Sequence, residues 1–411
     1  SSVASGRNNG NGNGDDDIIT LQDGSNSVIA GAGNDTISVG AGSNFVFGDE
    51  GKREVLTDGG GNPTGTTEVT SLNGSVGGQD GITVGSGYNV AVGGADVDTI
   101  TVNGTTPAAR GIVLGDNGKL VLDNAGTLLS IESTDFASGA ADIIQLTAGT
   151  NAIVGGRGAD QITAGTGNNT ILGDDGQATF FGNGDLEEIQ STNPGSGGDD
   201  QISLQAGTNV VIGGAGNDSV SAASGTNTIL GDEGRATLFT DGTLKLILST
   251  NLGVGGHDQI TLVDGINSVI AGFDNDIISV GSGTNFVFGD EGRREVLTDG
   301  AGIPTGITEV TSLNGSVGGQ DNITVGSGYN VVAGGANSDT IAVNGTTASA
   351  RGIVLGDNGT ILLTNSGTLL NIASTDFASG AADIIGLTAG TNAVIGGAGA
   401  DQITAGAGSN T

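Results

Sequence analysis

The sequence predicts an all-β fold, a parallel β-solenoid (β-roll or β-helix) with about 18–22 residues per coil and three coils in each unit of 58–67 residues. Composition is the first observation behind this prediction, because 82 glycines, 10 phenylalanines, two tyrosines and no tryptophan leave little material for a wide core. The second is a nine-residue period of short Val, Ile and Leu runs separated by bends rich in Gly, Asn and Asp. The third is repetition at two longer periods, which indicates a stack of like units.

The nine-residue period defines the coil. Within residues 200–234, Ile202, Val211, Val220 and Ile229 recur every nine positions. Each half-turn of nine residues is expected to form a short strand and a bend, where glycine supplies the positive φ values that tight bends need. Two half-turns then make an 18-residue coil, and stacked coils bury one apolar residue per strand.

The third coil of each unit is predicted to be wider than the other two. In one unit it contains TLFTDGTLKLILST, residues 237–250, in which Asp241 and Gly242 offer an alternative, a two-residue hairpin that projects from the solenoid. We favour the continuous coil, because Leu238 keeps the register of Val220.

The longer repeats set the expected domain organisation. A G-D-acid/Asn-G tetrapeptide marks each unit and starts at Gly48, Gly115, Gly173, Gly231, Gly289 and Gly356. The segment that begins at Gly48 returns 241 residues later, at Gly289, without insertion or deletion. Residues 1–411 are therefore predicted to form one continuous tandem-repeat solenoid. Both ends interrupt a unit and neither resembles a cap, so we expect an interior piece of a longer rod.

A nonapeptide motif, G-G-x-G-x-D-x-U-x with U a large aliphatic residue, recurs along the chain. Unbroken copies start at Gly155, Gly213 and Gly396, and near matches start at Ala30, Gly93, Ala271 and Gly334. The motif resembles that of the repeats-in-toxin, or haemolysin-type, calcium-binding family. The resemblance implies a right-handed parallel β-roll in which bend carbonyls and the Asp carboxylate ligate calcium between successive coils.

The two edges of the predicted solenoid differ in chemistry, because the nonapeptide alternates with a second bend, G-x-N, instead of following itself. One edge should therefore be acidic and the other amidic. The amidic edge is expected to carry a structural ladder of asparagines without a ligand role, at positions 26, 44, 89, 151, 169, 209, 227, 267, 285, 330, 392 and 410.

The acidic edge is the candidate metal site. An 18-residue coil stacks Asp17 with Asp35, Asp80 with Asp98, Asp142 with Asp160, Asp200 with Asp218, Asp258 with Asp276, Asp321 with Asp339, and Asp383 with Asp401. Carboxylates on strands roughly 4.8 Å apart repel each other, so the ladder needs cations or protons. Oxygen-only ligands favour calcium, and one histidine with no cysteine disfavours zinc. The tetrapeptide acids fall on the same edge and are candidates to complete a second site: Asp49, Asp116, Asp174, Asp232, Asp290 and Asp357.

The charge of the chain restricts its partners. Forty-five acidic and eleven basic residues give a net charge of −34, which disfavours nucleic acid and anionic membrane surfaces and attracts divalent cations. No apolar run of 18 or more residues is present, so membrane insertion is not expected. The expected partners are further copies of the repeat, self-associated into a filament, and surface glycans. An extracellular or cell-surface location in a bacterium is expected.

An enzyme is not expected from these residues. His257 lies in one of seven equivalent bends, and Tyr88 and Tyr329 have no visible acid-base partner. Arg110 and Arg351 could bind a carboxylate, but they are interpreted as members of surface pairs. The function predicted is a calcium-stiffened extracellular structural or adhesive repeat protein, such as a fibre, surface layer or adhesin stalk. The alternative is a calcium-binding secretion or glycan-binding module of a larger toxin or polysaccharide-modifying enzyme.

Overall fold

The computed structural model describes residues 2–5, 14–72, 74–134, 136–137, 139–375 and 380–411. Within these ranges every regular element is a β-strand, and no helix long and apolar enough to cross a membrane is found. The chain divides into two compact units, Ser1–Asn209 and Val210–Thr411, which are described separately.

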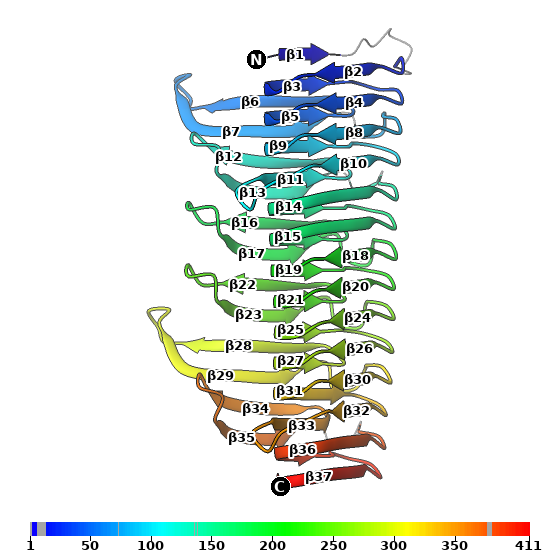
Figure 1. The fold of residues 1–411 in the computed structure, drawn as a ribbon, viewed down its shortest axis with the longest axis vertical. Helices are drawn as coiled ribbons and strands as arrows, with labels where there is room; N and C mark the ends of the chain where they lie inside the picture. Colours follow the sequence, from blue (N-terminus) through cyan, green and yellow to red (C-terminus); the bar gives the residue numbers. More distant parts are fainter. Residues whose placement is uncertain (1, 6–13, 73, 135, 138, 376–379) are drawn as a thin grey trace. The chain divides into compact units, whose positions relative to one another are not determined.

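The first unit contains a stack of parallel strands (Figure 1). Its parallel strands are β1 (Ser2–Ser5), β2 (Ile18–Leu21), β3 (Gly24–Ile29), β4 (Thr36–Val39), β5 (Gly42–Phe47), β8 (Gly81–Val84), β9 (Gly87–Val92), β10 (Thr99–Val102), β11 (Arg110–Leu114), β14 (Ile143–Val154), β15 (Gln161–Leu172) and β18 (Gln201–Leu204). Its antiparallel strands are β6 (Gly51–Thr57), β7 (Pro63–Ser71), β12 (Gly118–Asp123), β13 (Leu128–Ser133), β16 (Gly176–Phe180) and β17 (Leu186–Ser191). Strand β19 (Gly207–Ile212) spans the division between the units.

The second unit repeats this plan. Its parallel strands are β20 (Ser219–Ala222), β21 (Gly225–Leu230), β24 (Gln259–Leu262), β25 (Gly265–Ile270), β26 (Ile277–Val280), β27 (Gly283–Phe288), β30 (Asn322–Val325), β31 (Gly328–Gly335), β32 (Thr340–Val343), β33 (Arg351–Asp357), β36 (Ile384–Ile395) and β37 (Gln402–Asn410). Its antiparallel strands are β22 (Gly234–Leu238), β23 (Leu244–Ser249), β28 (Gly292–Thr298), β29 (Pro304–Ser312), β34 (Gly359–Thr364) and β35 (Leu369–Ser374).

Most coils consist of a short strand of four residues and a longer strand of about six, and in β14, β15, β36 and β37 the two run together as one long strand. In the short strands burial alternates: Ile202 and Leu204 of β18 are buried, whereas Gln201 and Ser203 face solvent. In six of the longer strands, β5, β9, β19, β21, β25 and β27, the last four residues are all buried. Alternating burial indicates one covered face and continuous burial indicates two. The parallel β-solenoid predicted from the sequence is therefore confirmed, with a core between the short and the longer strands.

The prediction of a wide third coil is wrong, because the corresponding residues form an antiparallel hairpin. Strand β22 pairs with β23, with Gly234 opposite Ser249. The loop is not the two-residue turn considered as the alternative. Phe239 N–H donates to Thr243 O at 2.8 Å, Gly242 N–H donates to Phe239 O at 2.9 Å, and Gly242 has φ of 78°. These contacts define a three-residue loop with a G1 bulge.

The same hairpin follows each of the six tetrapeptides. Strands β6–β7, β12–β13 and β16–β17 pair in the first unit, and β22–β23, β28–β29 and β34–β35 pair in the second. Leu238 misled the prediction because an apolar residue at that position also suits a hairpin strand, in which Ala236 and Ile247 are buried opposite each other. Each unit of the sequence therefore comprises two coils and one hairpin.

The last glycine of the tetrapeptide lets the hairpin begin close to the solenoid. A Cβ atom on Gly292 would lie 2.3 Å from Phe288 Cδ1, and one on Gly51 would lie 2.0 Å from Phe47 Cδ1. No real Cβ approaches so closely, so only glycine permits this contact. The hairpin thereby packs against the buried phenylalanine that precedes the tetrapeptide in these two places, Phe47 or Phe288.

Candidate metal centre

The predicted aspartates form a continuous ladder on one edge of each unit. In the first unit the backbone N–H of each aspartate donates to Oδ1 of the next, at 2.6–2.8 Å, in the order Asp17, Asp35, Asp80, Asp98, Asp142, Asp160 and Asp200. In the second unit the order is Asp218, Asp258, Asp276, Asp321, Asp339, Asp383 and Asp401, at 2.7–3.2 Å. The sequence predicted only the pairs 18 residues apart. The structure also joins each pair to the next, across 40–45 residues.

The second carboxylate oxygen, Oδ2, is buried and makes no hydrogen bond in eight of these described residues, namely Asp35, Asp80, Asp98, Asp142, Asp276, Asp321, Asp339 and Asp383. Buried polar oxygens are usually hydrogen-bonded, so this repeated exception suits the binding of a positively charged ligand. Oδ1 therefore makes the hydrogen bond between coils, whereas Oδ2 makes none; we call such an Oδ2 atom open.

Glycines make room for these open oxygens. A Cβ atom on Gly93 would lie 2.2 Å from Asp98 Oδ2 and 2.4 Å from Gly115 O. A Cβ atom on Gly48 would lie 2.0 Å from Asp80 Oδ2 and 2.8 Å from Gly93 O. The first glycine of the nonapeptide and the first glycine of the tetrapeptide therefore share one role. Each admits a carboxylate oxygen beside a bend carbonyl.

Burial makes the ladder electrostatically unfavourable. It raises the pKa of Asp98 and Asp339 to about 10, and each is raised further by neighbouring aspartates. Burial also raises the pKa of Asp80 and Asp383 to about 7. A buried carboxylate that stays ionised at neutral pH needs a cation nearby.

The tetrapeptide acids lie beside the ladder but bind backbone amides. Asp290 accepts a hydrogen bond from Gly319 N–H at 2.6 Å and another from Ala336 N–H. Asp232 and Asp357 also accept two such bonds each, one from the segment that follows the hairpin and one from the next nonapeptide bend. These contacts tie the hairpin to the coil. That these acids also complete a second metal site stays a prediction.

The amidic edge forms the predicted asparagine ladder. Nδ2 of each asparagine donates to Oδ1 of the next at 2.8–2.9 Å, in the order Asn26, Asn44 and Asn89; Asn151, Asn169 and Asn209; Asn227, Asn267, Asn285 and Asn330; and Asn392 and Asn410. Gly111 and Gly352 interrupt it, because they pair with Asn89 and Asn330 where an amide would stand. The amides bind one another, as predicted for a structural ladder.

Sequence reasoning missed an aromatic–arginine cluster that occurs in both copies of the 241-residue repeat. The guanidinium of Arg53 lies 3.8 Å from the ring centroid of Phe45, whose ring lies 6.2 Å from that of Tyr88. Arg294 lies 4.1 Å from the Phe286 ring in the second copy. The pairing of Phe45 with Arg53 needs the hairpin, so the continuous-coil prediction concealed it.

His257 occupies an ordinary repeat position. Its backbone N–H donates to Asn217 Oδ1 at 2.9 Å, and the equivalent N–H of Gln320 donates to Asn275 Oδ1 at 2.8 Å. The backbone contact is the same with either side chain, which agrees with the interpretation of His257 as a substituted repeat position.

The donor atoms on the acidic edge fit calcium. They are carboxylate oxygens and bend carbonyl oxygens, the hard ligands that calcium accepts in irregular geometry. The described residues contain no group of three or more His, Cys, Asp or Glu side chains suited to a metal. A calcium ion there would therefore depend on backbone carbonyls as well as on the open Oδ2 atoms. Asp80 and Asp98 illustrate the carboxylates that would hold it.

Comparison with known proteins agrees with this chemistry. The sequence model of the RTX calcium-binding nonapeptide repeat (4 copies) matches residues 4–37, 21–52, 138–180, 194–229, 203–238, 261–294, 317–345 and 378–411. These segments cover more than half of the chain and include all three unbroken nonapeptides. Searches of curated proteins and of solved structures gave no significant match.

Proposed function

Because the chain belongs to the RTX calcium-binding nonapeptide repeat family, we propose that it is a calcium-stiffened extracellular structural or adhesive protein, such as a fibre, a surface-layer component or an adhesin stalk. The observation that carries the proposal is the repeated open Oδ2 of the buried aspartates. The same contact recurs from coil to coil in each unit, as expected of a material whose repeats all perform one task.

The residues of the ladder act in two ways. Oδ1 of each aspartate accepts a backbone N–H of the neighbouring coil, as at Asp80 and Asp98 with 2.8 Å, and so fixes the coil spacing. The Oδ2 atoms and the bend carbonyls would hold calcium, which would supply positive charge that offsets the repulsion between the carboxylates. Since the carboxylates are buried, their repulsion without a cation opposes folding, and binding to the folded state stabilises it.

The repetition of surface features supports a structural role over a catalytic one. Phe45, Arg53 and Tyr88 recur 241 residues later as Phe286, Arg294 and Tyr329, in the same arrangement. A protein that presents like surfaces at a fixed interval suits a stalk or fibre. We propose that further copies of the repeat continue it as a filament. Proteins of this family are typically secreted by bacteria, and we place this chain outside the cell.

Calcium dependence of folding tests the proposal. The full chain is compared by circular dichroism in about 1 mM calcium, a typical extracellular level for such modules, in equimolar magnesium and in chelator. We expect native β content and a raised melting temperature in calcium alone. Binding at 100 times Kd adds about 2.7 kcal/mol per site. Equal β content and equal melting temperature in all three conditions would refute the proposal.

A further inference from the structure

In the described part of each unit, the outward positions of the short strands carry no charged side chain. We define the neutral face as the first and third residues of the short strands: β2, β4, β8, β10, β18 and the starts of β14 and β15 in the first unit, and β20, β24, β26, β30, β32 and the starts of β36 and β37 in the second. These residues point outward, since the second and fourth residues are buried in β4, β18 and β24. Each outward residue is Thr, Ser, Gln, Asn, Ile, Ala or Gly.

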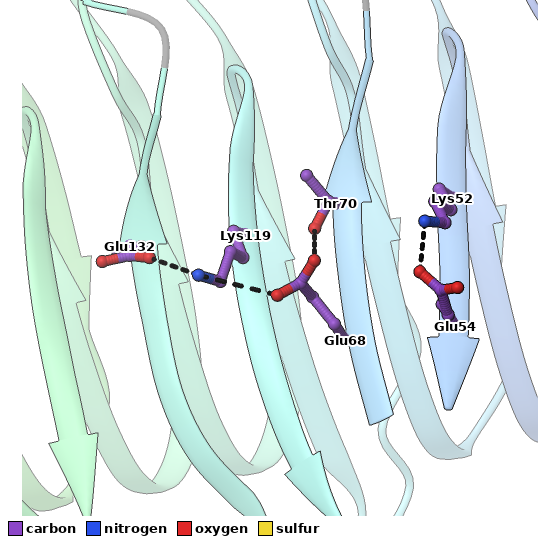
Figure 2. Close-up of polar contacts among 6 residues, drawn as sticks. All are labelled: Lys52, Glu54, Glu68, Thr70, Lys119 and Glu132. Atoms are coloured by element: carbon purple, nitrogen blue, oxygen red, sulfur yellow. Dashed lines mark hydrogen bonds and ion pairs between the residues drawn. The ribbon is translucent and has the colours of Figure 1, made fainter. Parts of the chain in front are cut away.

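Other outward surfaces do carry charge. In the first unit neighbouring hairpins also pair with each other, β7 with β12 and β13 with β16, and so form a hairpin sheet. On this sheet Lys119 Nζ lies 3.3 Å from Glu132 Oε1 and 3.6 Å from Glu68 Oε2. Figure 2 shows this row of side chains and the neighbouring pair of Lys52 with Glu54. Acidic side chains are thus present on the hairpin sheet but absent from the neutral face of the described strands.

The neutral face is regular and partly apolar. Parallel pairing places Gln161 opposite Gln201, so outward side chains form rows at roughly 4.8 Å from strand to strand. Ile18 is 85% exposed, Ile384 is 53% exposed and Ile277 is 43% exposed. Uncharged β faces with polar amide rows and apolar side chains pack against like faces.

We propose that the neutral face is a lateral contact between two copies of this chain, an inference that rests on the proposed structural function. Two molecules with a charge of −34 each repel wherever acidic surfaces meet. The neutral face has no acidic side chain, so this repulsion is low where two such faces meet. A two-fold arrangement would bring the face of one copy against the same face of the other.

The size of the face sets the expected strength. Seven strands about 4.8 Å apart and about 13 Å wide present roughly 440 Å² per unit. Stable interfaces bury about 800 Å² on each partner. A single unit therefore gives a weak, reversible contact, and association strengthens with the number of units engaged.

Paired glutamines provide a matched test. Gln161 and Gln201 lie opposite each other on the neutral face, and Gln177 and Gln190 lie opposite each other on the hairpin sheet. The double variants Gln161→Glu/Gln201→Glu and Gln177→Glu/Gln190→Glu add the same charge at near-constant side-chain shape. Sedimentation velocity of the full chain in calcium, over a concentration series, compares both with the wild type.

We expect the wild type and the hairpin-sheet variant to dimerise alike, and the neutral-face variant to bind itself at least about tenfold more weakly. A wild type that stays monomeric, or a neutral-face variant that associates like the wild type, overturns the inference. Equal weakening of both variants also overturns it, because net charge alone would then explain the effect.

A second measurement does not depend on the glutamates. The chain has no cysteine, so Thr163→Cys on the neutral face and Gln177→Cys on the hairpin sheet each introduce one thiol. Oxidation should yield covalent dimers of the first variant and few of the second; equal yields would contradict the inference. Circular dichroism of the same samples separates the two proposals. A chain that folds with calcium but stays monomeric refutes only the lateral contact, whereas a chain indifferent to calcium refutes the proposed function.

Discussion

Replacing Asp80 by asparagine should have opposite effects with and without calcium. The amide oxygen can still accept the N–H of Asp35, which lies 2.8 Å from Asp80 Oδ1. The substitution removes the negative charge and exchanges the open Oδ2 for an NH₂ group. With calcium the variant loses a ligand, and without calcium it loses a buried, repelled carboxylate.

The size of the stabilisation expected without calcium follows from the pKa of Asp80. Burial, the largest cause, raises the pKa of Asp80 from 3.8 to about 7, so keeping it ionised at pH 7.5 costs the folded state about 4 kcal/mol. The buried NH₂ group offsets part of this gain, because it also needs a partner. We expect Asp80→Asn to stabilise the calcium-free protein by about 1–4 kcal/mol and to weaken calcium binding at this bend.

Amide hydrogen exchange provides a local readout. Protection of peptides that cover β4 and β8, next to Asp80, should rise in chelator and fall in calcium when the variant is compared with the wild type. Asn89→Ala is the matched control, because Asn89 lies on the amidic edge of the same coil and accepts from Asn44 at 2.8 Å. It should lose protection equally in both conditions. Loss of protection in both conditions by Asp80→Asn would refute the assignment of Oδ2 as a calcium ligand.

Three further predictions follow from the same contacts. Burial raises the pKa values of ladder carboxyls such as Asp80 and Asp383, so without calcium the stability of the fold should be greatest below about pH 4 and should fall as pH rises through about 7. Saturating calcium should remove this loss of stability. Melting temperatures measured over a pH series, with and without calcium, would test both expectations. Gly334→Ala would place Cβ 2.3 Å from Asp339 Oδ2, so it should lower the stability of the fold by about 1–3 kcal/mol and weaken calcium binding in a calcium titration. Gly300→Ala is the control, because a Cβ atom there meets open space, and it should change neither quantity much. Arg294→Ala removes the stack on Phe286 and should lower the stability of the β28–β29 hairpin by about 1–2 kcal/mol, seen as faster amide exchange confined to it.

The repetitive features of the fold could be predicted because each residue type at the bends makes the same kind of contact in every coil. The nine-residue spacing of Ile202 and Val211 gave the parallel coils, and the alternation of Asp with Asn bends gave the acidic and amidic edges. The buried hydrogen bond from Asn169 to Asn209 confirms the amide ladder. Local periodicity suffices for such contacts because neighbouring coils are nearly identical.

The hairpins and the full length of the ladder could not be predicted from the period. Residues 237–250 satisfy both the nine-residue register and the two-residue alternation of a hairpin, and only pairing across β22 and β23 distinguishes them. Asp35 and Asp80 are 45 residues apart, so their contact becomes evident only once the intervening hairpin is recognised. The tetrapeptide was the available signal, because its final glycine marks the point at which the chain leaves the coil.

The aspartate ladder continues past the hairpins, so the number of residues between two successive coils can vary. Successive rungs are separated by 40 residues from Asp160 to Asp200, by 44 from Asp98 to Asp142 and by 45 from Asp35 to Asp80, yet the rung-to-rung hydrogen bond stays at 2.7–2.8 Å. Inserted segments of different length, each begun by the tetrapeptide, thus leave these edge contacts unchanged. The hairpins are therefore suitable insertion sites, at which a foreign loop or a small domain could be displayed at intervals along the scaffold.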